Sequence, residues 1–361
     1  MKIPKFMRAK KAVDFNIPNT NKPSDDLLEY IKDDQYGIDL KIDGTRAVID
    51  IDEEGNITIY GRGTVQKQLH SEERVQRVYN DQFPELAKIK IPELALTRLD
   101  SELIIKNPDT GKTDYNLLET RVSRKKDVQL YAAKYPACFQ VFDIQKFKGE
   151  DLTNKSLFSR RIALHEASLQ MMKIQKQIEI MSLGVDVDQK NKIVLQALES
   201  DAEGVMIKDL DAIYNDGSGE WFKAKRVHTE DVFVLGITEG TGKYKPYFGQ
   251  LHCYQFDEYG KIHFICSVGG GFSFEQMAAI REYYGKDVYY PKIKDSRQML
   301  NQYQMLKEMN KLLVIEIKHY GIVKSGRRHP NFIRIREKDA EECILSSSQP
   351  TDDQMSLEEF Y

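Results

Sequence analysis

The dipeptide Asp43-Gly44 separates two short stretches, residues 36–41 and 45–51, in which apolar and polar residues alternate. Such alternation predicts strands, and an Asp-Gly pair favours a tight turn between them. A hairpin turn after residue 51 leads into a third predicted strand at 57–60. The pattern therefore predicts that Lys41 lies at the end of a strand, on a rigid support.

Further apolar stretches predict the secondary structure of the rest of the first 229 residues. They indicate strands at 99–105, 138–144, 204–207 and 220–226 and helices at 157–172 and 192–200. Strands, helices and turns alternate throughout, which favours an α+β domain built on antiparallel sheets. With 361 residues, the chain is too long for one typical core, and we expect two domains.

The character of the sequence changes at Asp231. Five short strands are predicted at 232–237, 249–256, 262–268, 312–317 and 332–336, with one helix near 274–284. Five strands with an inserted helix indicate a small Greek-key barrel of the oligonucleotide-binding (OB) type. The predicted division is 1–229 for the α+β domain, 230–345 for an OB-fold domain and 346–361 for a flexible acidic tail.

Composition argues against several classes of protein. No apolar run approaches the roughly 20 residues of a membrane span, and no signal-peptide core follows Met1, so an intracellular, cytoplasmic protein is expected. The four cysteines are far apart and form no C-x-x-C pair. Neither a disulfide framework nor a zinc site is therefore predicted, and we expect reduced thiols.

The net charge of −3 conceals an uneven distribution. Residues 339–361 carry seven acidic residues and no Lys or Arg, so the remainder of the chain has a net charge of +4. Basic clusters at 121–126, 223–226 and 324–338 could neutralise backbone phosphates. Each cluster alone is equally explained as a solvated charged face.

Seven short motifs follow one another between residues 36 and 339. They are Lys41-Ile-Asp-Gly-Thr-Arg46, Gly61-Arg62-Gly63, Leu99-Asp-Ser-Glu102-Leu, Val141-Phe142-Asp143-Ile, Glu203-Gly204-Val-Met206-Ile-Lys208, Trp221-Phe-Lys223-Ala-Lys225 and Arg328-His-Pro-Asn-Phe332-Ile-Arg334-Ile-Arg336. In this order and spacing the chain resembles the ATP-dependent DNA ligases, in the compact two-domain form without an extra amino-terminal DNA-binding domain. The resemblance implies nick sealing in replication, repair or recombination.

The resemblance assigns Lys41 as the nucleophile that attacks the α-phosphate of ATP. Nearby cations and desolvation disfavour the charged form of an amine and so make it available for attack. Lys223 and Lys225 are the implied catalytic cations, since alternate positions of a strand point to one face. Without Lys41, a solvated edge strand would explain these two lysines as well.

A divalent ion is also implied, because a triphosphate brings charge that lysines alone do not organise. Hard oxygen ligands suit Mg²⁺ or Mn²⁺. The resemblance points to Glu102 and Glu203 as the residues that position the metal. Either glutamate could instead belong to an ordinary salt bridge.

The nucleoside would be held by residues of three motifs and by Asp39, two residues before Lys41. The resemblance implies that Phe142 stacks on one face of adenine and Met206 caps the other, although both residue types are more often found in a core. Asp39 could accept a hydrogen bond from the adenine amino group. Asp43 and Arg46 would contact the ribose and the nick.

Nicked duplex DNA is the implied partner of a protein expected to be a monomer. Arg62 resembles the receptor for the 5′-phosphate of the nick, a role that suits a planar and permanently charged guanidinium. Arg46 and Arg328 are further candidates for DNA contact.

Two departures from the family pattern stand out. Asp100-Ser101-Glu102-Leu103 replaces Asp-Gly-Glu-Leu, which keeps the carboxylate. The carboxy-terminal motif usually closes Arg-x-Asp-Lys, whereas here Arg336 is followed by Glu337-Lys338-Asp339. Arg336 and, in a shifted register, Lys338 are the candidates for contact with the departing pyrophosphate.

Two alternatives remain open on the sequence. An RNA ligase or a GTP-dependent capping enzyme shares the lysine motif, although the segments 221–225 and 328–336 fit DNA ligases better. A non-catalytic nick-binding protein associated with a clamp is the second alternative, suggested by the reversed order of Lys338 and Asp339.

The last eight residues resemble the peptide Gln-x-x-aliphatic-x-x-aromatic-aromatic that binds ring-shaped sliding clamps. Gln354 would enter a polar pocket, and Leu357, Phe360 and Tyr361 would form an apolar plug at one-turn spacing. An acidic tail with incidental aromatic residues is the alternative explanation.

Overall fold

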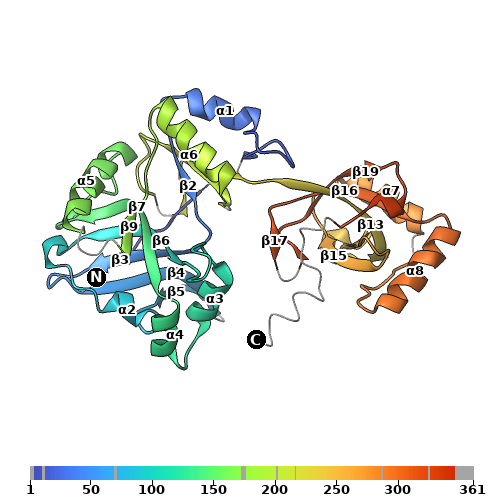
Figure 1. Ribbon diagram of the computed structural model, residues 1–361, viewed down its shortest axis with the longest axis horizontal. Helices are drawn as coiled ribbons and strands as arrows, with labels where there is room; N and C mark the ends of the chain where they lie inside the picture. Colours follow the sequence, from blue (N-terminus) through green and yellow to red (C-terminus); the bar gives the residue numbers. More distant parts are fainter. Residues whose placement is uncertain are drawn as a thin grey trace. The chain divides into compact units, whose positions relative to one another are not determined.

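The computed structural model describes residues 4–9, 13–68, 71–171, 176–200, 202–215, 217–285, 288–323 and 326–345 (Figure 1). The chain divides into two compact units. The first contains the residues up to Asn16 together with Asn21–Lys225, and the second contains Ile17–Thr20 and the residues from Arg226 onward. The boundary predicted from the sequence, after residue 229, lies four residues beyond Lys225, and the prediction placed Ile17–Thr20 in the first domain. No helix in the described ranges is long and apolar enough to cross a membrane.

A small antiparallel sheet carries Lys41. Its strands are β2 (Tyr36–Lys41), β10 (Gly204–Asp209) and β12 (Trp221–Lys225), in the order β12-β10-β2. One face packs against α1 (Asp25–Lys32) and α6 (Val187–Glu199), which lie beside β2 in Figure 1. The residues that form this core include Leu27, Ile31, Ile38, Ile193, Val194, Val205, Ile207 and Ala224. The helices leave the other face of the sheet available.

A larger sheet forms the rest of the first unit, in the order β5-β4-β3-β6-β7-β8, with β9 beside β7. Its strands are β3 (Thr45–Ile51), β4 (Ile57–Gln68), β5 (Ser71–Val78), β6 (Arg98–Ile105), β7 (Ala137–Phe147), β8 (Glu150–Asp151) and β9 (Ile178–Ile180). All pairs are antiparallel except β7 with β9. The prediction of an α+β domain built on antiparallel sheets is confirmed.

The Asp43-Gly44 turn joins the two sheets. β2 belongs to the small sheet and β3 to the large one, so the two strands that flank this turn do not pair with each other. A side chain at Gly44 would place its Cβ 2.6 Å from the carbonyl oxygen of Leu103 and 2.7 Å from Cγ of Glu102. Only glycine therefore allows the turn to pack against β6.

Shorter elements complete this unit. Parallel β1 (Met7–Arg8) and β11 (Gly217–Ser218) form a two-stranded sheet, and the helices are α2 (Pro84–Ala87), η1 (Pro92–Leu94), α3 (Tyr115–Ser123), α4 (Val128–Lys134) and α5 (Leu157–Gln170). The sequence predicted α5 and part of α6 but not α1, α3 or α4. α1 and α3 nevertheless carry a capping signal, because Ser24 and Asp114 accept hydrogen bonds from the backbone N–H groups of Leu27 and Leu117.

The second unit is a five-stranded antiparallel sheet in the order β15-β14-β13-β16-β19. The strands are β13 (His228–Ile237), β14 (Leu251–Phe256), β15 (Ile262–Val268), β16 (Leu313–His319) and β19 (Asn331–Arg336). A parallel bridge between Gly270 and Asn331 brings the end of β15 to β19. This contact closes the sheet into the predicted OB-fold barrel. Gly271 has φ +93° there, and a Cβ would lie 2.4 Å from the carbonyl oxygen of Phe332.

Two helices interrupt the barrel, whereas the sequence predicted one. They are α7 (Phe274–Tyr284), which was predicted, and α8 (Ser296–Glu308), which was not. The buried residues of α8 are Met299, Tyr303 and Leu306, at helical spacing on an otherwise polar segment. Its N-cap, Asp295, accepts a hydrogen bond from Gln298 N. Short elements in this unit are η3 (Gly242–Tyr244), β17 (Ile322–Val323), β18 (Gly326–Arg327) and η4 (Ala340–Glu342).

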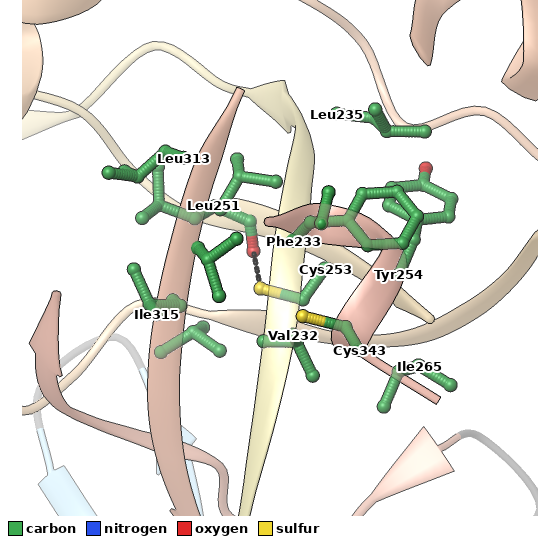
Figure 2. Close-up of a cluster of buried hydrophobic side chains, with 14 of the residues drawn as sticks. Val232, Phe233, Leu235, Leu251, Cys253, Tyr254, Ile265, Leu313, Ile315 and Cys343 are labelled. Atoms are coloured by element: carbon green, nitrogen blue, oxygen red, sulfur yellow. Dashed lines mark hydrogen bonds between the residues drawn. The ribbon is translucent and has the colours of Figure 1, made fainter. Parts of the chain in front are cut away.

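The core of the barrel is apolar and contains sulfur (Figure 2). Cys253 lies among Val232, Phe233 and Leu251, and its Sγ donates to the carbonyl oxygen of Leu251 over 3.7 Å. Cys253 and Cys266 are directly opposite on β14 and β15. All four cysteines are free thiols and buried.

Candidate active site

The open face of the small sheet gathers five of the predicted residues. Asp39, Met206 and Lys223 are register partners across β2, β10 and β12. The next row contains Lys41, Gly204 and Lys225. Register partners on neighbouring strands, and alternate residues along one strand, point to the same face of a sheet. We call this face the site face. It carries Asp39, Lys41, Met206, Lys223 and Lys225, together with Lys208 and Trp221.

Gly204 lies between Lys41 and Lys225 in its row and has no side chain of its own. Its φ is +135°, and a Cβ would lie 2.0 Å from the carbonyl oxygen of Ala224. Glu203, the residue before it, accepts a hydrogen bond from Lys41 Nζ, and both side chains are largely buried. The strand end therefore holds the amine of Lys41 against a carboxylate.

The charge around Lys41 is predominantly positive. Partial burial lowers the pKa of Lys223, and repulsion from Lys41, Lys225 and Arg62 lowers it further, whereas Glu203 opposes this shift. The structure thus brings the three lysines and Arg62 within electrostatic reach of one another. Such a cluster can stabilise negative charge on a phosphate.

Glu102 lies beside this cluster, on β6. Burial raises the pKa of its carboxyl to about 7, although the positive charges of Lys41, Arg46 and Arg62 favour ionisation. Across the part of the chain that the structure describes, no three His, Cys, Asp or Glu side chains gather to hold a metal ion. Mg²⁺ usually binds through one or two carboxylates and substrate phosphates, a mode that Glu102 and Glu203 would fit.

A buried cluster that includes two aromatic side chains, which we call the aromatic cluster, adjoins the site face. Phe142 and Trp221 are buried and meet edge to face with 5.8 Å between ring centroids. Met206 packs against the same cluster, so the structure brings together the two residues predicted to sandwich adenine. Within the described residues, two buried polar atoms here lack a hydrogen-bond partner, Asp39 Oδ1 and Trp221 Nε1.

Asp39 is paired with a residue that the sequence did not single out. Lys208 Nζ donates to Asp39 Oδ2 over 2.5 Å, and both side chains are almost fully buried. Nζ also lies 4.5 Å from the ring centroid of Phe142 and 4.4 Å from that of Trp221. A lysine at the end of an alternating strand gave no signal that its charge would be buried.

Arg46 lies in a buried network. Its guanidinium donates to both carboxylate oxygens of Asp100, to the carbonyl oxygen of Met7 and to the hydroxyl of Tyr214. These four hydrogen bonds explain why Asp100, the aspartate of the motif at 99–103, is buried. They also engage the guanidinium of Arg46, which was predicted to contact the ribose and the nick. Ser101, where the family has glycine, is accommodated because its hydroxyl donates to the carbonyl oxygen of Ala47 over 2.8 Å.

Two other predicted residues remain near the surface. Arg62 lies on β4 with an exposed side chain, and its pKa is lowered by desolvation and by Arg46. Asp43 is half-buried in the turn that follows β2. Arg62 is therefore available to an external phosphate.

The predicted residues of the carboxy-terminal motif belong to the second unit. Asp231 accepts a hydrogen bond from Lys338 over 2.9 Å and lies 3.3 Å from Nε of Arg336. One carboxylate therefore holds both cations, which supports a shared role. Asp339 precedes η4, and its backbone N–H donates to Glu342. Arg328 lies in the loop before β19, half-buried.

Sequence reasoning also missed the support of Phe142. Arg161 of α5 donates to the carbonyl oxygens of Phe142 and Met181. The preceding residue, Arg160, forms two hydrogen bonds of 2.9 Å with Asp143, and both side chains are fully buried. The sequence showed only the basic pair Arg160-Arg161 on an amphipathic helix.

The four residues of the clamp-binding prediction, Gln354, Leu357, Phe360 and Tyr361, lie outside the described residues.

The folds of the two units define a class of protein, in which a nucleotidyltransferase domain is followed by an OB-fold barrel. The chain belongs to the family of the ATP dependent DNA ligase domain, whose sequence profile matches residues 19–225.

Curated relatives carry the same family name. DNA ligase 1 of Saccharomyces cerevisiae is 27% identical over 364 residues, which cover 91% of this chain and 45% of that protein. A DNA ligase of Ignicoccus hospitalis is 29% identical over 255 residues, which cover 67% of this chain and 41% of that protein. The chain thus spans less than half the length of these relatives.

Solved structures share the fold. A structure described as Pmar-Lig_Pre matches with a TM-score of 0.61 and 21% identity, over 93% of this chain and 69% of that one. A Lig E DNA ligase matches with a TM-score of 0.56 and 18% identity, over 93% of this chain and all of that one.

Proposed function

We propose that the protein is an ATP-dependent DNA ligase that joins a 3′-hydroxyl to a 5′-phosphate at a nick in duplex DNA. The observation that carries the proposal is the site face, where Lys41, Lys223 and Lys225 lie together and Lys41 donates to Glu203, beside the aromatic cluster. Membership of the ligase family supports it. A role in replication, repair or recombination follows from such an activity.

In the first step, Lys41 Nζ forms a bond to the α-phosphorus of ATP. The bond from that phosphorus to the β-bridging oxygen breaks, and pyrophosphate leaves. Nζ must first lose a proton, and Glu203 is the carboxylate that holds the ammonium. Lys223 and Lys225 would offset the charge that develops on the α-phosphate.

In the second step, the AMP group moves from Lys41 to the 5′-phosphate of the nick, where Arg62 would bind. In the third, the 3′-hydroxyl attacks that phosphate and AMP leaves with the electron pair of the broken anhydride bond. Catalysis rests mainly on alignment and charge stabilisation.

Mg²⁺ would be held by Glu102 and Glu203 together with the phosphates, and when bound it supplies positive charge that neutralises the triphosphate. Phe142 and Met206 would enclose adenine, and Asp43 would face the ribose. Arg336 and Lys338 would bind the β- and γ-phosphates. Their common partner, Asp231, keeps the two cations together.

One assay tests this proposal against its alternatives. The protein is incubated with Mg²⁺ and either ATP or GTP, and its intact mass and its activity on nicked DNA and nicked RNA are measured. An added AMP together with sealing of DNA supports the proposal. An added GMP would instead identify a capping-type enzyme, and no adduct at all would indicate a non-catalytic nick-binding protein.

Arg62→Ala should separate the first two steps. Because Arg62 is assigned to the nick phosphate, the variant should still acquire AMP but transfer it to DNA about 100-fold more slowly, as expected for loss of a charge-assisted contact. Single-turnover transfer from the adenylylated protein measures this rate. The control is Lys192→Ala, an exposed position on α6. Equal losses in both steps would instead place Arg62 in the nucleotide pocket.

The tail prediction concerns a sliding clamp of the archaeal, eukaryotic or viral type. Deletion of residues 352–361 should leave the sealing of nicked oligonucleotides unchanged, because Gln354, Leu357, Phe360 and Tyr361 are assigned to the clamp alone. Stimulation by the clamp should disappear, since tethering raises the local concentration of the protein on DNA. Undiminished clamp binding, measured by surface plasmon resonance, would rule out this role.

A further inference from the structure

A buried ion pair, Lys208–Asp39, lies beside the aromatic cluster, and its two members differ in what they can offer a ligand. Asp39 Oδ2 accepts from Lys208 Nζ, while Oδ1 is buried and has no partner among the described residues. A buried acceptor without a donor is costly for a folded protein. Its position on the site face, two residues before Lys41, favours a ligand that brings the missing donor.

Resting on the function proposed above, we propose that Lys208 determines the base specificity of the site by keeping Asp39 an acceptor. With Lys208 in place, Oδ1 is free to accept a hydrogen bond from the exocyclic amino group of adenine. Hypoxanthine and guanine carry a carbonyl oxygen at the equivalent position, so two acceptors would face each other. The specificity would thus reside in the Lys208–Asp39 pair rather than in Asp39 alone.

The surroundings explain why Lys208 is required. Burial raises the pKa of the Asp39 carboxyl, and the ammonium of Lys208 is the main influence that opposes the rise. Arg161 of α5 also favours the ionised form, while Asp143 of β7 disfavours it and is itself paired with Arg160. Without Lys208, the carboxyl would take up a proton more readily, and its O–H would become a donor.

The rings of Phe142 and Trp221 fix the ammonium from the other side. Nζ lies within 4.5 Å of both ring centroids, a distance that suits cation–π attraction. Methionine at position 208 would fill a similar volume without the charge. The substitution therefore removes the ammonium while leaving most of the packing in place.

The test compares ATP with inosine triphosphate as the source of the nucleotide in full-length protein. Wild type should label with ATP about 10- to 100-fold faster, the range for a hydrogen bond to a charged acceptor. In Lys208→Met, this preference should fall about tenfold or more. Labelling of that variant by inosine triphosphate, relative to labelling by ATP, should also rise as the pH is lowered, because the acid form of Asp39 becomes more populated.

Two further variants separate this role from a structural one. Lys208→Arg keeps a cation beside Asp39 and should retain the preference for ATP. Lys190→Met is the matched control, because Lys190 is also a buried lysine and, within the described ranges, donates to the backbone carbonyls of Ile31 and Asp33 rather than to a carboxylate. It should lose stability without any change in base preference.

The outcomes distinguish the two proposals. A wild-type protein that labels with ATP, combined with a Lys208→Met variant that keeps the wild-type preference at every pH, would overturn the role of Lys208 and leave the ligase proposal intact. Absence of labelling in the wild type would remove both. If Lys208→Met does not fold, Asp39→Asn decides: its amide can both donate and accept, so unchanged selectivity in that variant would refute the inference.

Discussion

Replacing Lys41 by arginine should abolish both the covalent AMP adduct and the sealing of nicked DNA. Arginine keeps a positive charge beside Glu203, but a guanidinium stays protonated and cannot act as a nucleophile at neutral pH. Lys223 and Lys225 share the site face, but the proposal assigns the nucleophile to Lys41, whose Nζ donates to Glu203. The expected loss is complete within the sensitivity of intact-mass analysis.

The control for this variant is Lys192→Arg, on the exposed surface of α6. It should form the adduct at the wild-type rate. Sealing of DNA that already carries a 5′-adenylate should survive in Lys41→Arg, because that reaction bypasses the lysine. An adduct on the Lys41→Arg protein, mapped by peptide mass spectrometry to another residue, would disprove the assignment.

Replacing Asp143 by asparagine should cause the largest loss of stability among the positions described. The change leaves the guanidinium of Arg160 buried with no opposing charge, and removal of one partner from a buried ion pair costs about 3–5 kcal/mol. For a domain of this size, the melting temperature should fall by about 10 °C. Thermal unfolding followed by circular dichroism measures the shift.

A surface ion pair on neighbouring residues provides the comparison. Glu150 lies 4.0 Å from Lys155, and both side chains are mostly exposed. Glu150→Gln should change the free energy of unfolding by less than about 1 kcal/mol, as is usual for exposed pairs. A loss in Asp143→Asn no larger than in Glu150→Gln would show that Arg160 finds compensation elsewhere, for instance in the carbonyl oxygens of Lys155 and Ala212 to which it already donates.

For the small sheet, the sequence was sufficient to predict that Lys223 and Lys225 share a face. Period-two alternation along one strand predicts this before any pairing is known. It could not predict the register, which places Met206 between Asp39 and Lys223. The register depends on how β2 and β10 pack on α1 and α6, and these contacts join distant parts of the chain.

Buried charges were the main feature that the sequence did not reveal. Lys208 is 169 residues from Asp39, and Arg46 is 54 residues from Asp100, so no local pattern shows that either cation has a partner. Arg46 was therefore predicted to contact the ribose and the nick, whereas in the structure its guanidinium forms hydrogen bonds inside the protein. The helix α8 was missed for a different reason, because its few apolar positions are diluted by polar residues on the exposed side.

The four thiols provide a separate reporter for each unit of the protein. Cys138 lies in the first unit, where burial raises its pKa to about 11, and Cys343, with a pKa raised to about 12 by burial, lies with Cys253 and Cys266 in the barrel. Buried, protonated thiols react with alkylating reagents only when the surrounding structure opens. Pulsed alkylation followed by peptide mass spectrometry would therefore measure the opening of the two units independently, without any engineered residue.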